Sequence, residues 1–209
     1  MSETPAPTAS PAIEWAARGQ PIPGELESGD LHIAIEFPGG ALLGLIDGLG
    51  HGSEAAAAAR TAEMVLSAHP YRPISSLIGD CHEALRSTRG AVISLASVDA
   101  RLGKLCWGGV GNVEAVLNRA DAAASPRRER ILLRSGVVGY QLPPLRTVEL
   151  PIRPGDVLIF ASDGLKHDFA EEPPARLEPA QHAEYLIKTY SKDSDDALVL
   201  VARYRGTAA

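Results

Sequence analysis

The chain has 209 residues, 45% of them hydrophobic, and a formal net charge of −6, values typical of one globular domain with a sizeable core. Only 5% of the residues are aromatic and Lys and Arg form no dense cluster, which argues against nucleic-acid binding. Because the sequence has neither a signal-peptide pattern nor an apolar run of about 18 residues, we predict a cytoplasmic protein without membrane contact.

The first half of the chain predicts a tail, three strands and two helices. Residues 1–11 are rich in Pro, Ser, Thr and Ala and bury too little apolar area to offset the entropy of ordering, so we expect a disordered tail before one domain over residues 12–206. Strands are predicted at 13–17, 31–37 and 41–46. Helices are predicted at 53–68, where Ala dominates, and at 74–87.

From residue 91 onward the pattern is typical of antiparallel β-structure, with short apolar runs divided by Gly, Asp, Asn or Pro. The polar stretch 121–130 is predicted to be a hairpin loop. Helices on the outer faces of antiparallel sheets, an α+β architecture, fit this order of elements. The predicted strands are 91–98, 105–110, 113–117, 131–133, 148–152, 157–161 and 198–204, with a helix near 180–190.

Three short acidic motifs, far apart in sequence, each stand at the end of a hydrophobic strand. Asp47 follows the run 42–46, Asp163 follows the run 157–161, and Asp195 stands just before the run 197–201. Carboxylates brought together are costly unless a cation lies among them. Because Mg²⁺ and Mn²⁺ prefer oxygen ligands and retain water, the sequence predicts a metal-dependent hydrolase.

In this order the motifs resemble the metal-site motifs of the PPM-type (type 2C) serine/threonine phosphatases, in their bacterial SpoIIE-like branch. Within that branch, residues 109–112 and 136–143 look most like the RsbX group, small stand-alone phosphatases of stressosome signalling. The resemblance extends over most of the chain. It implies a four-layer αββα sandwich of two antiparallel sheets flanked by helices.

The resemblance also implies a site with Mn²⁺ or Mg²⁺, expected as two ions. Asp47 would bridge them, with the Gly48 carbonyl, Asp163 and Asp195 as further ligands, and Asp47 and Asp163 would act catalytically through metal-activated water. For Asp30 two interpretations stay open, a metal ligand or a carboxylate that caps a turn.

Four further residues receive interpretations from the sequence. Asp196 is expected to support a ligand or cap a turn. His51 either protonates the leaving group or has a local structural role, and the second is preferred. Asn112 is interpreted as a left-handed turn residue and Asp168 as a surface acid.

The expected activity is removal of phosphate from Ser or Thr of a bacterial signalling protein. The resemblance implies a phosphorylated STAS-domain protein of the stressosome as partner, in negative feedback, and a monomeric enzyme. Two alternatives are an anti-anti-sigma factor as substrate and a catalytically silent module that binds a partner. The polar segments 121–130 and 171–178 are the predicted contact surface for the substrate protein.

Overall fold

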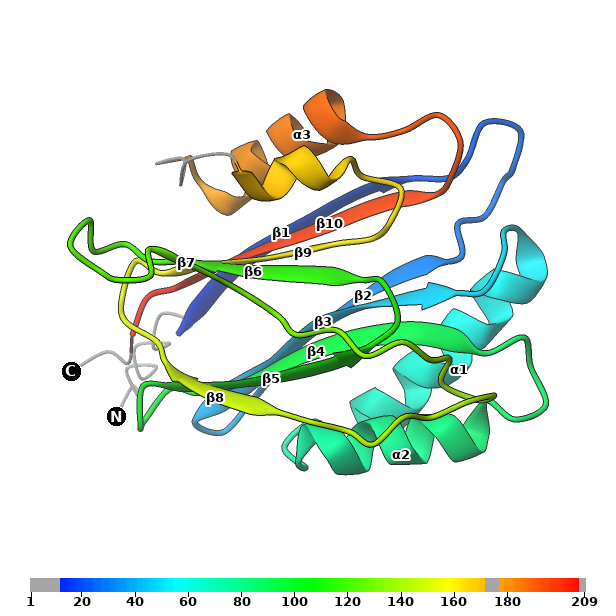
Figure 1. Ribbon diagram of the computed structural model, residues 1–209, viewed down its shortest axis with the longest axis horizontal. Helices are drawn as coiled ribbons and strands as arrows, with labels where there is room; N and C mark the ends of the chain where they lie inside the picture. The colour runs from blue at the N-terminus through cyan, green and yellow to red at the C-terminus, as the bar shows by residue number, and fades with distance from the viewer. Residues whose placement is uncertain (1–11, 172–176, 207–209) are drawn as a thin grey trace, which may run out of the picture.

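The computed structural model describes residues 12–171 and 177–206, so the predicted tail and most of segment 171–178 lie outside the described residues. Two antiparallel five-stranded sheets lie face to face (Figure 1). One sheet has the order β2 (Asp30–Phe37), β3 (Gly40–Gly48), β4 (Ala91–Asp99), β5 (Lys104–Val110) and β8 (Val148–Pro151). The other has the order β1 (Ile13–Gln20), β10 (Ala197–Tyr204), β9 (Val157–Ala161), β6 (Glu114–Asn118) and β7 (Arg128–Arg130).

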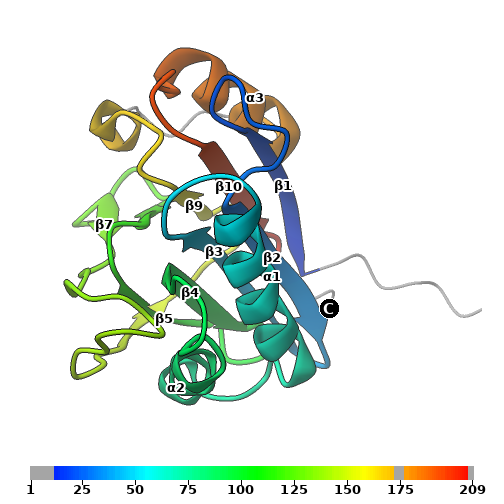
Figure 2. The same ribbon diagram turned by 90° about the vertical axis from the view of Figure 1, so that its right-hand side faces the viewer.

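Helices cover the outer face of each sheet. The helices α1 (Ser53–Ala68) and α2 (Ile74–Ala84) lie on the sheet that contains β3, and α3 (Pro179–Tyr190) lies on the sheet that contains β10 (Figure 2). A short 3₁₀-helix, η1 (His167–Glu171), contains Asp168. The four-layer α+β sandwich predicted from the sequence is confirmed.

Strand β3 shows how the apolar pattern builds these layers. Successive side chains of a strand point to opposite faces, and in β3 both faces are buried. Leu43 and Leu45 pack between the sheets, whereas Leu42 and Ile46 pack against the helices. Asp47 follows at the end of this strand, on the side that faces the other sheet.

Close packing of α1 on β3 depends on small residues. Ala55, Ala58, Ala59 and Ala62 are fully buried, and their short side chains let the helix backbone approach the sheet. A Cβ atom on Gly48 would lie only 2.2 Å from the Ala55 carbonyl oxygen. The glycine after Asp47 is therefore required by this contact.

Two predicted elements are wrong in their bounds. The strand predicted at 131–133 is not formed, and the strand is instead β7, inside the predicted loop 121–130. β7 pairs with β6, so that Glu129 lies opposite Leu117 and forms an ion pair with the buried Arg119. The helix predicted at 74–87 ends at Ala84, where the Leu85 N–H donates to the Cys81 carbonyl.

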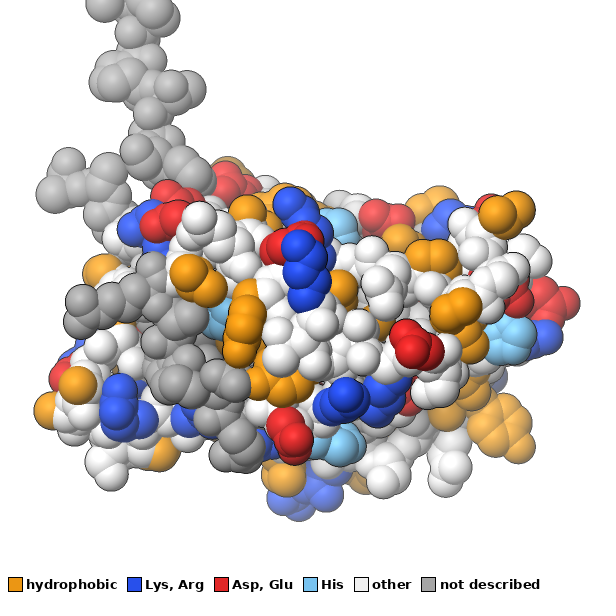
Figure 3. Space-filling view, turned by 90° about the horizontal axis from the view of Figure 1, so that it is seen from above, with side chains coloured by type: hydrophobic (Ala, Val, Ile, Leu, Met, Phe, Trp, Pro, Cys, Tyr) orange, Lys and Arg blue, Asp and Glu red, His pale blue; other side chains and the backbone are white. Residues whose placement is uncertain are grey.

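Charged side chains of both signs lie together on the face over α3 and β1 (Figure 3). Glu184 on α3 pairs with Arg18 of β1 and with Lys188 one turn further along the helix. One acidic residue on this face thus pairs with two basic ones. Among the described residues, no helix is long and apolar enough to cross a membrane.

Candidate metal centre

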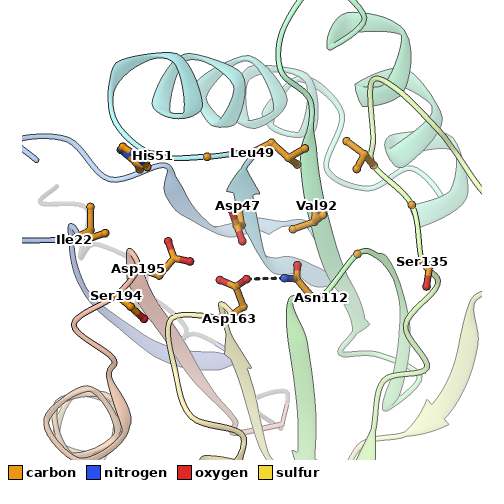
Figure 4. Close-up of a pocket in the computed structure, with 14 residues that line it drawn as sticks. Ile22, Asp47, Leu49, His51, Val92, Asn112, Ser135, Asp163, Ser194 and Asp195 are labelled. Atoms are coloured by element: carbon orange, nitrogen blue, oxygen red, sulfur yellow. Dashed lines mark hydrogen bonds between the residues drawn. The ribbon is translucent and has the colours of Figure 1, made fainter.

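One end of the sandwich carries a pocket of ≈ 520 Å³, where β3 and β9 end and β10 begins. Asp47 of one sheet and Asp163 and Asp195 of the other line it together (Figure 4). The structure therefore brings three of the predicted site residues to one place. The remaining lining residues are Ile22, Leu49, Gly50, His51, Val92, Gly111, Asn112, Ser135, Gly136, Val137 and Ser194.

Asp30 lies directly behind Asp47, because the two residues face each other in the pairing of β2 with β3. The Asp30 side chain is 6% exposed, and its Oδ2 atom has no hydrogen-bond partner. Its backbone N–H donates to the Ser28 hydroxyl at 3.1 Å, so it is the Ser28 side chain that caps this turn. Asp30 itself does not line the pocket.

Burial and mutual repulsion disfavour the charged forms of both carboxyl groups. Burial raises the pKa of Asp47 to about 9, and the negative charge of Asp30 adds to this. Burial raises the pKa of Asp30 to about 7, opposed by a hydrogen bond with Ser162 and reinforced by Asp196. The causes that act on these two carboxyl groups within the described chain include no positive charge, and a cation bound in the pocket would stabilise their charged forms.

Asp163 is held by two polar groups that the sequence analysis missed. The Asn112 Nδ2 atom donates to its carboxylate at 2.7 Å, and the Lys192 ammonium donates to its backbone carbonyl at 2.6 Å. Burial and the charge of Asp195 raise the pKa of Asp163, while Lys192 and Asn112 oppose the rise. These contacts orient Asp163 towards the pocket.

The prediction that Asn112 is a left-handed turn residue is wrong. Within the described residues only glycines have positive φ, and the left-handed position here is Gly111, with φ 105°. A Cβ on Gly111 would lie 2.2 Å from the Val92 side chain. Gly111 therefore makes the turn, which leaves Asn112 free to point at Asp163.

The neighbouring acids Asp195 and Asp196 have different surroundings. Asp195 lines the pocket, whereas Asp196 is buried and accepts hydrogen bonds from the backbone N–H groups of Ile22 at 2.7 Å and Gly29 at 2.6 Å. Asp196 therefore fastens the loop between β1 and β2. Of its two interpretations, the capping of backbone N–H groups is the one that agrees with these hydrogen bonds.

His51 and Asp168 lie at the surface. The His51 ring borders the pocket, and its Nδ1 atom is paired with Glu25 at 2.8 Å. This pairing agrees with the local structural role preferred for His51. Asp168 is exposed in η1, outside the pocket, as the sequence predicts.

The donor atoms fit a hard divalent cation. The acids that line the pocket offer only oxygen, the ligand type that Mg²⁺ and Mn²⁺ prefer. Over residues 12–171 and 177–206, no three His, Cys, Asp or Glu side chains have by themselves the geometry to hold an ion. An ion would then keep several waters, as Mg²⁺ commonly does with one or two carboxylates. Gly48, predicted as a carbonyl ligand, is buried and does not line the pocket.

The chain is similar to several solved structures. One, described as "The bacterial stressosome: a modular system that has been adapted to control secondary messenger signaling", is 29% identical, with a TM-score of 0.84 over 91% of this chain and 99% of that one. RsbX in complex with magnesium is 20% identical, with a TM-score of 0.81 over 91% of this chain and 94% of that one. The serine/threonine phosphatase PstP/Ppp of Mycobacterium tuberculosis is 16% identical, with a TM-score of 0.73 over 92% and 99%.

Sequence comparison gives the family directly. None of the curated protein sequences compared with the chain matches it. A family model of stage II sporulation protein E (SpoIIE) matches residues 38–205, most of the described chain. The resemblance stated from the acidic motifs is thereby confirmed. The chain belongs to the SpoIIE family of PP2C-type phosphatase domains, a family of metal-dependent serine/threonine phosphatases.

Proposed function

We propose that this chain is a Mn²⁺- or Mg²⁺-dependent phosphoprotein phosphatase that removes phosphate from Ser or Thr of a STAS-domain protein of a stressosome. The observation that carries the chemistry is the meeting of Asp47, Asp163 and Asp195 in one pocket, where burial and neighbouring acids disfavour the charged form of Asp47. The likeness to RsbX and to a stressosome structure supports the class of substrate.

Each acid has a distinct role in this proposal. Asp47, at the end of β3, and Asp163, beyond the end of β9, would hold two ions between the sheets, with Asp195 as a further ligand. When bound, the ions neutralise the phosphate and lower the pKa of the attacking water. Asn112 fixes the carboxylate of Asp163, so that this ligand is oriented before substrate arrives. Asp30 supports the site from behind, as a buried acid next to Asp47.

The test is hydrolysis of a small aryl phosphate by the purified chain. We expect activity with Mn²⁺ or Mg²⁺ and none after chelation. Asp47→Asn and Asp163→Asn should each lower kcat/KM by at least about 100-fold while the fold persists, because each removes a charge partner of the metal and no core packing. Asp168→Asn, a change of an exposed acid outside the pocket, is the matched control and should retain wild-type activity.

Three outcomes would contradict all or part of the proposal. Full activity after exhaustive chelation would exclude metal-dependent hydrolysis. No activity of the wild-type chain on aryl phosphate or phosphoprotein at any metal concentration, with partner binding retained, would favour the catalytically silent module. An anti-anti-sigma factor dephosphorylated faster than a stressosome STAS-domain protein would keep the chemistry and change the substrate.

A further inference from the structure

Two loops border the pocket from opposite sides, and we call them the rim loops. The first rim loop, residues 21–29 between β1 and β2, contributes Ile22 to the lining. The second rim loop, residues 131–147 between β7 and β8, contributes Ser135, Gly136 and Val137. Ile22 and Ser135 stand on opposite sides of the acids (Figure 4). A macromolecule that brings a phosphate to Asp47 would therefore approach between these two loops.

Each rim loop displays a large hydrophobic side chain to solvent. Leu26 is 99% exposed and Tyr140 is 85% exposed, whereas the other exposed large hydrophobic residues of the described chain range from 40% to 68%. Tyr140 lies close to the pocket lining, because its N–H donates to the Val137 carbonyl at 3.1 Å, and Leu26 directly follows Glu25, whose N–H donates to the Ile22 carbonyl at 3.1 Å. The two most exposed apolar side chains thus belong to the two loops that border the candidate metal centre.

Both loops are fixed by hydrogen bonds and packing. Asp196 accepts from two amides of the first rim loop, and Glu25 of that loop pairs with His51. In the second, Val138 is fully buried and bridges to Ala91, and the Gly139 N–H donates to the His82 Nδ1 atom at 2.9 Å. Side chains on fixed loops lose less entropy on binding than side chains on mobile ones.

We propose that Leu26 and Tyr140 are the two anchors of a docking surface for a folded phosphoprotein, which presents apolar surface on both sides of its phosphorylated residue. This inference rests on the proposed function and adds the recognition surface to it. Aromatic and aliphatic anchors near the centre of an interface commonly carry most of its binding energy. Contacts remote from the phosphate would orient it for attack, whereas a small aryl phosphate enters the pocket without them.

The experiment compares two substrates and four variants. The substrates are a serine-phosphorylated STAS-domain protein and a small aryl phosphate, both with Mn²⁺. The variants are Leu26→Ser, Tyr140→Ser, their combination, and Leu102→Ser as the matched control. Leu102 is 68% exposed in the turn between β4 and β5, at the end of those strands that lies away from Val92 and Gly111 of the pocket.

We expect each rim variant to lose about tenfold in kcat/KM on the phosphoprotein, which corresponds to about 1.4 kcal/mol, mostly through a higher KM. Turnover of the aryl phosphate should stay within about twofold of wild type, because neither side chain lines the pocket. The combined variant should lose more than either single one. Leu102→Ser should behave as wild type on both substrates.

Several results would overturn the inference. Equal losses on both substrates would mean that the side chains support the pocket, and unchanged phosphoprotein turnover would place docking elsewhere. If the rim variants have a smaller particle mass in solution than the wild type and lose no activity selectively on the phosphoprotein, then this face is a contact between two copies of the chain. If the wild-type chain hydrolyses the aryl phosphate and not the phosphoprotein, the proposed substrate itself is wrong, a result distinct from unchanged variants.

Discussion

At the scale of single residues, the acidic motifs were predictable and their polar partners were not. Asp47, Asp163 and Asp195 each stand at a strand end, a position that sequence patterns show. Asn112 and Lys192 reach Asp163 across 51 and 29 residues of chain, and no local pattern signals either contact. Hydrogen bonds between residues so far apart in sequence depend on the tertiary fold, so sequence patterns alone do not predict them.

The buried acids predict a pH-dependent stability of the metal-free protein. In the folded chain the carboxyl pKa is raised to about 9 at Asp47 and to about 7 at Asp30, from 3.8. Between these values and 3.8 the folded state binds more protons than the unfolded state, so the free energy of unfolding falls as pH rises from about 4 towards 9. We expect Tm in chelator to decrease over this range.

Asp47→Asn tests the cause of that decrease. The variant has no charge to bury at this position, so in chelator at pH 8 it should melt above the wild type and show a shallower fall of Tm with pH. Each 1 kcal/mol gained corresponds to about 2–4 °C for a chain of this size. The same pH slope in Asp47→Asn as in the wild type and in the exposed-site control Asp168→Asn would contradict the assignment.

Lys192 gives a second prediction at this scale. Its ammonium donates to the Asp163 carbonyl and opposes the negative charge of the pocket. Lys192→Met should lower the free energy of unfolding of the metal-free protein by about 1–2 kcal/mol, and added Mn²⁺ should narrow the gap, because the ion then compensates the acids. Thermal melts with and without Mn²⁺ measure this effect.

The controls for Lys192 are available in the same chain. Lys188→Met removes an exposed lysine of α3 whose ion pair within the described part of the chain is with Glu184 at the surface, and such a pair contributes little. Lys192→Arg keeps the charge and should recover most of the stability. If Lys188→Met and Lys192→Met melt alike, with equal response to Mn²⁺, then Lys192 does not compensate the pocket.

At the scale of elements, prediction succeeded where one physical pattern dominated. The Ala-rich helix α1 has the predicted bounds, because its composition favours helix throughout and Gly52 and His69 lie just outside it. β7 was missed because its three residues are all charged, and it is a strand only through pairing with β6. Arg119 explains the pairing, since Glu129 of β7 and the buried Asp156 together compensate its guanidinium.

At the scale of the whole molecule, the order of the layers could be predicted from the sequence. The sequence did not show at which end of the sandwich each loop lies. In the register of β6 with β9, Glu114 pairs with Ala161 near the pocket, and Asn118 pairs with Val157 at the other end. The hairpin loop after β6 therefore lies about 17 Å, five strand residues, away from the pocket end. Figure 1 shows it at the left, with the pocket ends of β3 and β9 at the right.

Because segment 121–130 lies at the far end of the sandwich, it could contact only parts of the substrate protein that are remote from the phosphate, and we expect little effect of shortening this loop. Replacing residues 121–126 by an Asn-Gly turn would keep Arg119, Glu129 and Asp156, whose buried ion pairs hold this end together. Among the ion pairs described for residues 121–126, the change removes the weak surface pair between Asp121 and Arg153. The fold should persist.

We expect the shortened chain to retain kcat/KM within about twofold on both the phosphorylated STAS-domain protein and the aryl phosphate, because a segment about one strand length from the pocket does not touch the phosphate or its immediate surroundings. Steady-state kinetics of both substrates, beside Leu26→Ser and Tyr140→Ser, measure this directly. A selective loss on the phosphoprotein would show that the partner extends to the far end of the sandwich. A loss on both substrates would mean that the β6–β7 hairpin transmits strain to Asn112 and Asp163 through β6 and β9.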